Sequence, residues 1–214
     1  MAANRAVIDP LFLLRVRASL QGVQHLPFGK AKEQGGSFVL SPVHPTPTLV
    51  PGIAADGTKD SVRLPVAPIV WHTHPATCNL AVEGCSYDPP SDTDMANAYR
   101  NGLLRGQIAS IVFAHKGVYV VQMRTAFRNW VVVNRQRPER CTETVRRAFD
   151  RFQESQKLAD PDGPEHKKET LNKSFIKAWL AFARSYRLCK AGPKVFRIGY
   201  YKPEDTDVYV CLKP

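Results

Sequence analysis

Long apolar runs are missing from this chain of 214 residues, although 43% of its residues are hydrophobic. No run approaches the roughly 20 residues that a helix needs to cross a bilayer, and the first residues lack the plan of a signal peptide. Cysteine is scarce, with five scattered residues and no C-x-x-C pair, which argues against a disulfide framework and suits a reducing compartment. We therefore expect a soluble intracellular protein, cytoplasmic or nuclear, with no membrane partner.

Acidic residues are also fewer than basic ones, 19 against 30, which gives a formal net charge of +11. Residues 1–124 carry 11 Lys/Arg and 8 Asp/Glu, whereas residues 125–214 carry 19 and 11. On a helix, Arg140, Arg147 and Arg151 share one face. This face predicts docking on an acidic protein of an assembly. Nucleic acid is the second candidate partner, although no nucleic-acid-binding motif accompanies the charge.

Helical and strand patterns alternate along the chain. The expected helices span residues 9–24, 91–104, 137–156 and 171–188, and the expected strands span 35–40, 65–73, 107–114 with 118–123 as a hairpin, 129–134, and 195–201 with 207–212 as a closing hairpin. A Pro-rich loop at 41–51 contains His44, and 158–169 has the composition of a linker. These patterns predict an α/β (α+β) layer fold with a mixed sheet flanked by helices, divided into a domain at 1–135 and a basic helical extension at 136–214.

Two histidines stand at the end of one predicted strand. The stretch PVAPIVWHT at residues 65–73 is apolar and β-branched, and side chains two residues apart on a strand point to the same face. His72 and His74 therefore present their imidazoles side by side. Pro75 has no N–H for a sheet ladder, so the strand should stop there and leave the pair at its open end. An H-x-H pair alone is more often a surface pair without a metal, so a metal site requires a further ligand.

Ser91 and Asp94 begin the next predicted helix, whose apolar positions include Met95, Ala98 and Tyr99. The spacing S-x-x-D is typical of a capping box, in which the Ser oxygen accepts a backbone N–H and the acidic residue reaches back. The capping interpretation and a ligand role for Asp94 are compatible. Two imidazoles and a carboxylate suit zinc with one coordination position open, which is typical of a catalytic site.

The sequence HTHP at residues 72–75, followed by PSDTD at residues 90–94, resembles the signature of the JAMM (MPN+, JAB1-type) metalloproteases. That signature is an early Glu, then H-[ST]-H-P, then S-x-x-D, and the resemblance covers roughly residues 8–135. It implies a JAB1/MPN-like fold and a zinc hydrolase that cleaves a peptide or isopeptide bond, with ubiquitin-like conjugates as one substrate class.

The resemblance also assigns roles to individual residues. His72, His74 and Asp94 match the zinc ligands, and Ser91 matches the serine that hydrogen-bonds the oxyanion or the metal-bound water. Glu33, the only Glu before the motif, matches the general base.

One departure from the family pattern is the length of the segment between the second His and the Ser, which is sixteen residues from 75 to 90. Its ends adjoin the predicted ligands, so the segment should border the cleft. It contains Glu83, the substitute general base if Glu33 proves remote, and Cys78 and Cys85, for which free thiols, a disulfide and a soft metal contact are all open.

A second function, from another class, is compatible with the same residues. A protein of this fold can act as a structural or scaffold subunit of a larger assembly, with a weak or vestigial site. The metal content of the purified protein distinguishes the two functions.

Overall fold

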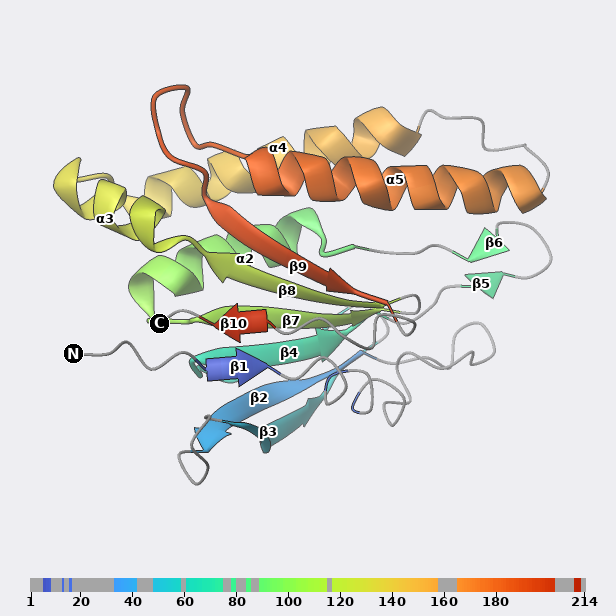
Figure 1. The fold of residues 1–214 in the computed structure, drawn as a ribbon, viewed down its shortest axis with the longest axis horizontal. Coiled ribbons are helices and arrows are strands. Elements are labelled where there is room, and N and C mark those ends of the chain that lie inside the picture. The colour runs from blue at the N-terminus through green and yellow to red at the C-terminus, as the bar shows by residue number, and fades with distance from the viewer. Residues whose placement is uncertain are drawn as a thin grey trace.

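The computed structural model describes most of the chain, namely residues 6–8, 13, 16, 33–41, 48–58, 61–74, 78–79, 84–85, 89–114, 117–157, 165–202 and 210–212. A six-stranded sheet forms its centre, with the order β3-β2-β4-β7-β8-β9 (Figure 1). The strands are β2 (Gln34–Ser41), β3 (Thr48–Asp56), β4 (Ile69–Thr73), β7 (Ala109–Ala114), β8 (Gly117–Met123) and β9 (Phe196–Tyr201). Only β4 and β7 pair in parallel, so the sheet is mixed and the predicted α/β (α+β) class is confirmed.

The described helices lie together on one side of this sheet (Figure 1). They are α2 (Asp92–Leu104), α3 (Thr125–Val133), α4 (Pro138–Lys157) and α5 (Glu165–Ser185). None of the described helices is both long and apolar enough to cross a membrane. Two short sheets complete the structure: β1 (Ala6–Ile8) pairs with β10 (Val210–Leu212), and β5 (Cys78–Asn79) pairs with β6 (Gly84–Cys85).

Alternation along the strands divides the buried side chains between two cores. On the helix side, Tyr119 of β8 meets Phe149 of α4 and Trp179 of α5 in one cluster. On the opposite side, Trp71 and Phe113 pack edge to face, with their ring centroids 5.9 Å apart. Because consecutive residues of β4 point to opposite cores, the strand can bury Trp71 on one side and turn its histidines to the side that α2 covers.

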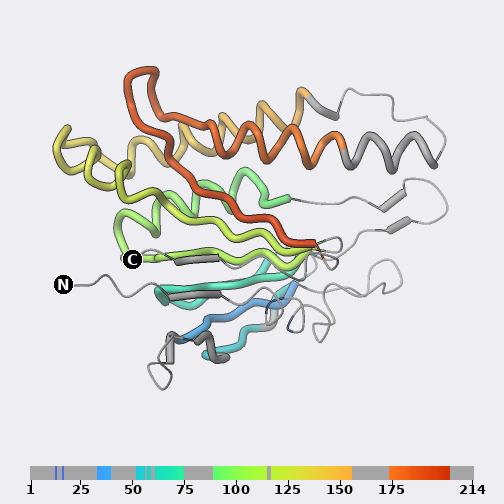
Figure 2. Tube along the Cα trace, viewed as in Figure 1, coloured from blue at the N-terminus to red at the C-terminus, as the bar shows by residue number. Residues whose placement is uncertain are grey.

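Several predicted elements are confirmed. The helix that begins after Ser91 is α2, the hairpin is β7–β8, and the amphipathic helices are α4 and α5. Of the helix predicted at 9–24, Leu13 and Val16 are described; both are helical, and Leu13 is fully buried. Figure 2, viewed as in Figure 1, shows β4, α2, β7 and β8 among the coloured parts of the trace.

The strand predicted at 129–134 is wrong, because these residues belong largely to helix α3. Phe127 and Val131 are buried four residues apart, whereas Val132 and Val133 are 76% and 79% exposed. Burial at i and i+4 is the helical period, and the β-branched run concealed it, since valine disfavours a helix only slightly.

The closing hairpin predicted from 195–201 and 207–212 is also wrong. Strand β9 pairs with β8 at the edge of the central sheet, and β10 pairs with β1 instead. Every residue of β8 is buried, so its outer hydrogen-bonding edge requires a partner strand, which β9 supplies. The predicted boundary at 135/136 stays a prediction, but the residues beyond it complete the central sheet.

Two predicted connections contain regular structure. Strand β3 begins at Thr48 inside the predicted Pro-rich loop, and its Pro51 is tolerated because β3 is an edge strand. Helix α5 begins at Glu165 inside the predicted linker, of which residues 158–164 lie outside the described part of the chain.

Replacing Trp179 by Ala should destabilise the protein by about 3–5 kcal/mol, because a fully buried indole is lost from the helix-side core. The free energy of unfolding in urea measures the effect. Val132→Ala on exposed helix surface is the control and should change stability by less than about 0.5 kcal/mol. A loss below about 1 kcal/mol for Trp179→Ala would show that α5 does not contribute to the core of the sheet.

Candidate metal centre

The two predicted histidines meet the first turn of α2 at one end of the central sheet. Strand β4 ends at Thr73. His72 lies within its last residues and His74 follows directly after it, and both face α2. Asp94 is the third residue of α2 and points back at the pair. Strands β4 and β7 are parallel, so the chain between them must cross over, and α2 makes that crossover. Ligands commonly bind at the carboxyl ends of strands in such units.

One potential ligand atom from each of the three side chains forms a triangle whose corners lie within 4.8 Å of one another. Nε2 of His72 lies 3.1 Å from Nε2 of His74. Asp94 places Oδ1 at 3.1 Å from the first nitrogen and Oδ2 at 3.1 Å from the second. Zinc bonds of about 2.05 Å at tetrahedral angles place ligand atoms about 3.3 Å apart. The cluster could therefore hold one metal ion through one atom of each side chain, and a tetrahedral ion would have one further position for another ligand.

Electrostatics keep the carboxylate of this triangle ionised. Burial raises the pKa of Asp94. The charge and hydrogen bond of His72, followed by those of His74, lower the pKa by a larger amount, so it lies well below the usual 3.8. Nδ1 of His72 is buried and has no hydrogen-bond partner among the described residues. A proton on this Nδ1 leaves the Nε2 lone pair directed at the other two ligands, which is the tautomer that binds a metal.

Ser91 holds the carboxylate in place. Its backbone N–H and its hydroxyl both donate to Oδ2 of Asp94, at 2.8 and 2.7 Å. The Ser91 hydroxyl oxygen in turn accepts the backbone N–H of Asp94 at 3.1 Å, which completes the predicted capping box. The hydroxyl proton is thus used within the cap, so Ser91 first acts as a support for the ligand, and the oxyanion role stays a prediction.

Glu33 lies at the same end of the sheet, one residue before β2. Gly35 is the Cα partner of His72 in the antiparallel β2–β4 pair, and the same register continued by two residues puts Glu33 opposite His74. The Glu33 backbone is held on its other side, since its N–H donates to Thr58 O and its carbonyl accepts from Gly57 N–H, both at 2.8 Å. The register therefore places the backbone of half-buried Glu33 beside the strand end that carries the histidines.

Two supporting contacts were not predicted from the sequence. Oγ1 of Thr73, between the two histidines, accepts the backbone N–H of Gln34 at 2.8 Å and so joins the strand end that carries Glu33 to the one that carries the histidines. Outside the site, Arg146 of α4 pairs with Asp92 in the first turn of α2 at 3.1 Å. The alternation of β4 places the Thr73 side chain opposite to the histidines, so its supporting contact could have been predicted. The contact of Arg146 could not, because its partner is 54 residues away and no local pattern marks the pair.

Some predicted residues cannot be placed. His44 and Glu83 lie outside the described residues. In the segment between His74 and Ser91, the backbones of Cys78 and Cys85 are directly opposite each other in the β5–β6 pair. The alternatives stated for these two cysteines remain open.

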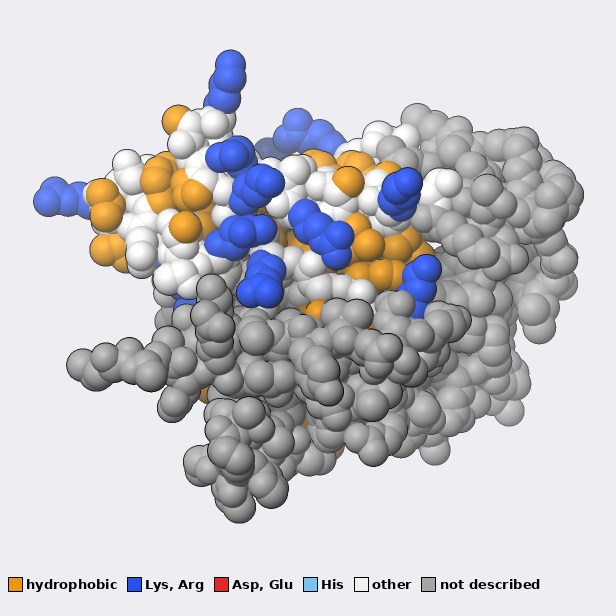
Figure 3. All heavy atoms as spheres, in the orientation of Figure 1, with side chains coloured by type: hydrophobic (Ala, Val, Ile, Leu, Met, Phe, Trp, Pro, Cys, Tyr) orange, Lys and Arg blue, Asp and Glu red, His pale blue; other side chains and the backbone are white. Residues whose placement is uncertain are grey.

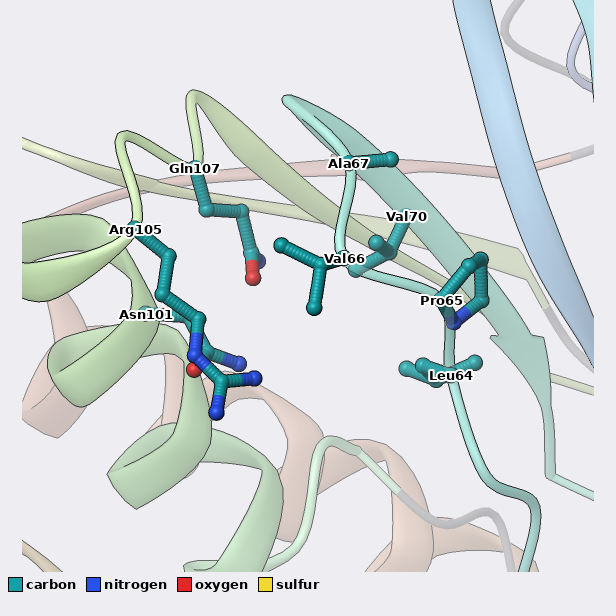
Figure 4. A pocket seen from close by; sticks show the side chains of 8 residues that line it. All are labelled: Leu64, Pro65, Val66, Ala67, Val70, Asn101, Arg105 and Gln107. Atoms are coloured by element: carbon teal, nitrogen blue, oxygen red, sulfur yellow. The ribbon is translucent and has the colours of Figure 1, made fainter.

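A separate hollow of about 30 Å³ lies at the other end of β4 and α2 (Figure 4). Val66 and Gln107 point toward each other across it, and Arg105 extends beside Asn101. The hollow lies at the start of β4 and the end of α2, whereas the histidines and Asp94 lie at the opposite ends of these two elements. It is therefore not part of the metal centre. Its volume is far below the several hundred Å³ that pockets for small ligands usually have.

No protein-family model, curated protein or solved structure matches this chain. Conclusions about function therefore depend on the geometry of the site. That geometry brings His72, His74, Asp94 and Ser91 into contact and could hold one metal ion.

Replacing Ser91 by Ala should weaken metal binding by about 10- to 100-fold, because the ligand carboxylate loses the hydroxyl that orients it. The same change removes the helix cap and should cost about 1 kcal/mol of stability. Zinc titration with a competing chromophoric chelator measures the affinity. Thr93→Ala, at an exposed position in the same turn, is the control. Equal affinities for Ser91→Ala and the unchanged protein would show that the cap does not support the ligand.

Proposed function

We propose that the protein is a zinc-dependent hydrolase of JAMM type that cleaves a peptide or isopeptide bond. The observation that carries the proposal is the cluster of His72, His74 and Asp94, in which one ligand atom from each side chain lies within 4.8 Å of the other two. Three protein ligands would leave a tetrahedral zinc ion one position for water. Support comes from the order of the residues, since the resemblance to the JAMM signature requires an early Glu, two histidines, and a Ser three residues before an Asp.

Zinc is the metal that this donor set favours. Two imidazole nitrogens and one carboxylate are ligands of intermediate and hard character, and a catalytic zinc site typically has three of them. When bound, zinc supplies Lewis acidity toward a carbonyl oxygen and lowers the pKa of water toward neutrality.

Three residues of the chain would carry out the proton transfer, the charge balance and the oxyanion binding. Glu33, at the adjacent strand end, takes the proton of the attacking water and returns it to the leaving amine. Asp94 would supply a negatively charged ligand that balances part of the charge of the metal. Ser91 orients Asp94, and we propose that its hydroxyl turns from Asp94 to donate to the oxyanion when substrate is bound.

A peptide or isopeptide linkage is the proposed substrate, with ubiquitin-like conjugates as the first class to examine. Incubation of the zinc-loaded protein with isopeptide-linked and linear ubiquitin-like dimers, followed by mass spectrometry of the products, tests the proposal. Cleavage at the linkage that disappears in Asp94→Ala is expected. Stoichiometric zinc without cleavage of either dimer or of a peptide library would refute hydrolysis, and a protein without metal would favour the scaffold function.

A further inference from the structure

The later part of helix α5, the connection after it and strand β9 carry a surface from which acidic residues are missing. Between positions 170 and 203 the sequence contains eight Lys or Arg and no Asp or Glu. We define the α5–β9 surface by six of these cations, all exposed: Lys177, Arg184, Arg187, Lys190, Lys194 and Arg197. Within the described residues none of the six takes part in an ion pair. The surface therefore presents uncompensated positive charge.

These cations share one side of the molecule because α5 and β9 are neighbours. Lys177 and Arg184 are two helical turns apart, and Nε of Arg184 donates to the carbonyl of Ile198 on β9 at 3.0 Å. Arg187 and Lys194 are bridge partners where the chain passes from helix to strand. Figure 3 shows Lys and Arg side chains spread over this face, with apolar side chains between them and no Asp or Glu side chain on its described part.

The positive charge predicted on α4 is more strongly compensated. Glu143 pairs with both Arg146 and Arg147, and Arg146 also pairs with Asp92. Glu139, Asp150 and Glu154 lie on the same helix. On the α4 face that the sequence pattern indicated, Arg147 is ion-paired and acidic residues share the helix. The α5–β9 surface has no acidic residue in its stretch of sequence and, within the described part of the chain, no ion pair among its six cations.

The side chains between the cations restrict the kind of partner. From 174 to 202 every exposed position is Lys, Arg, Ser, Ala or Cys. The large apolar side chains that are exposed lie elsewhere, at Val39, Ile53, Val66, Leu104, Val132 and Val133. Protein interfaces usually have an apolar centre with aromatic or aliphatic anchors, whereas contacts to a phosphate backbone need positive charge and hydrogen-bond donors alone.

We propose that the α5–β9 surface binds the phosphate backbone of a nucleic acid without regard to base sequence. Arg and Lys donate to phosphate oxygens, and they extend further into solvent than the partly buried apolar side chains of this stretch, such as Phe182 and Tyr200. The proposal does not depend on the metal centre, so it can fail or succeed separately from the proposed hydrolysis.

The test measures binding of the full-length protein to a fluorescent 20-base-pair DNA duplex and a 20-nucleotide RNA across a salt series. The triple variant Lys177→Gln, Lys190→Gln, Arg197→Gln removes three cations that make no side-chain hydrogen bond in the described structure. At the lowest salt we expect its affinity for at least one probe to fall at least tenfold. On duplex DNA its log–log salt slope should become shallower by up to about 2.7, since each phosphate contact contributes about 0.9.

A matched control removes the same charge from another surface, with Arg137→Gln, Arg140→Gln and Arg151→Gln near and on α4. Its affinity should change less than threefold. Equal weakening in both triple variants would overturn the proposal, because net charge and not this surface would then be responsible. If neither probe binds at low salt, the proposal is also overturned. If polyglutamate binds as tightly as the nucleic acids, the surface would instead be assigned to an acidic protein. Circular dichroism checks that both variants remain folded.

Discussion

Glu33→Gln is expected to reduce hydrolysis by about 10²- to 10⁴-fold while the protein keeps its full complement of zinc. The amide has nearly the same shape as the carboxylate but cannot accept the proton of the attacking water. Glu33 is outside the triangle of ligand atoms, so zinc affinity should stay within a few fold of that of the unchanged protein. Initial rates on the isopeptide-linked substrate and a parallel zinc titration separate the two effects.

Glu139→Gln on the exposed first turn of α4 is the matched control for this change, and its rates should be unaffected. Full activity in Glu33→Gln would contradict the assignment of the base and direct attention to Glu83. Equal loss of zinc and activity would show that Glu33 acts as a ligand.

His74→Ala should lose zinc binding by at least about 10³-fold and lose hydrolysis with it, because one of three protein ligands is removed. The fold should be retained, since both hydrophobic clusters are built from other residues. Calorimetric zinc titration and the thermal unfolding temperature of the metal-free protein measure the two parts. His25→Ala is the comparison, as a histidine outside the predicted motif. Retention of one tightly bound zinc in His74→Ala would contradict the ligand set.

Local signals in the sequence were sufficient for α2 and for the hairpin β7–β8. Ser91 and Asp94 mark the start of α2 by their spacing, and Met95 and Tyr99 are buried at helical intervals. Strand pairing over long distances had no such signal. The sequence shows a strand near residue 198, but not that its partner is β8 instead of the next strand. The strand prediction for residues 129–134 was wrong for another reason, because the run of valines concealed the helical spacing of the buried residues.

The candidate site shows the same division. His72, His74 and Asp94 could be grouped from the period of a strand, a capping motif and the family resemblance. The position of Glu33 could not be derived locally, since it depends on the antiparallel register of β2 with β4. Contacts across distant segments, such as Arg146 with Asp92, have no periodicity to reveal them.

The metal content of the unchanged protein tests the central claim most directly. We expect elemental analysis of protein purified without chelator to find about one zinc per chain, and a protein stripped by chelation and dialysed against zinc to recover the same amount. The triangle of His72, His74 and Asp94 predicts this stoichiometry because it supplies one set of three ligands. Protein that holds no stoichiometric metal in either preparation would contradict the account.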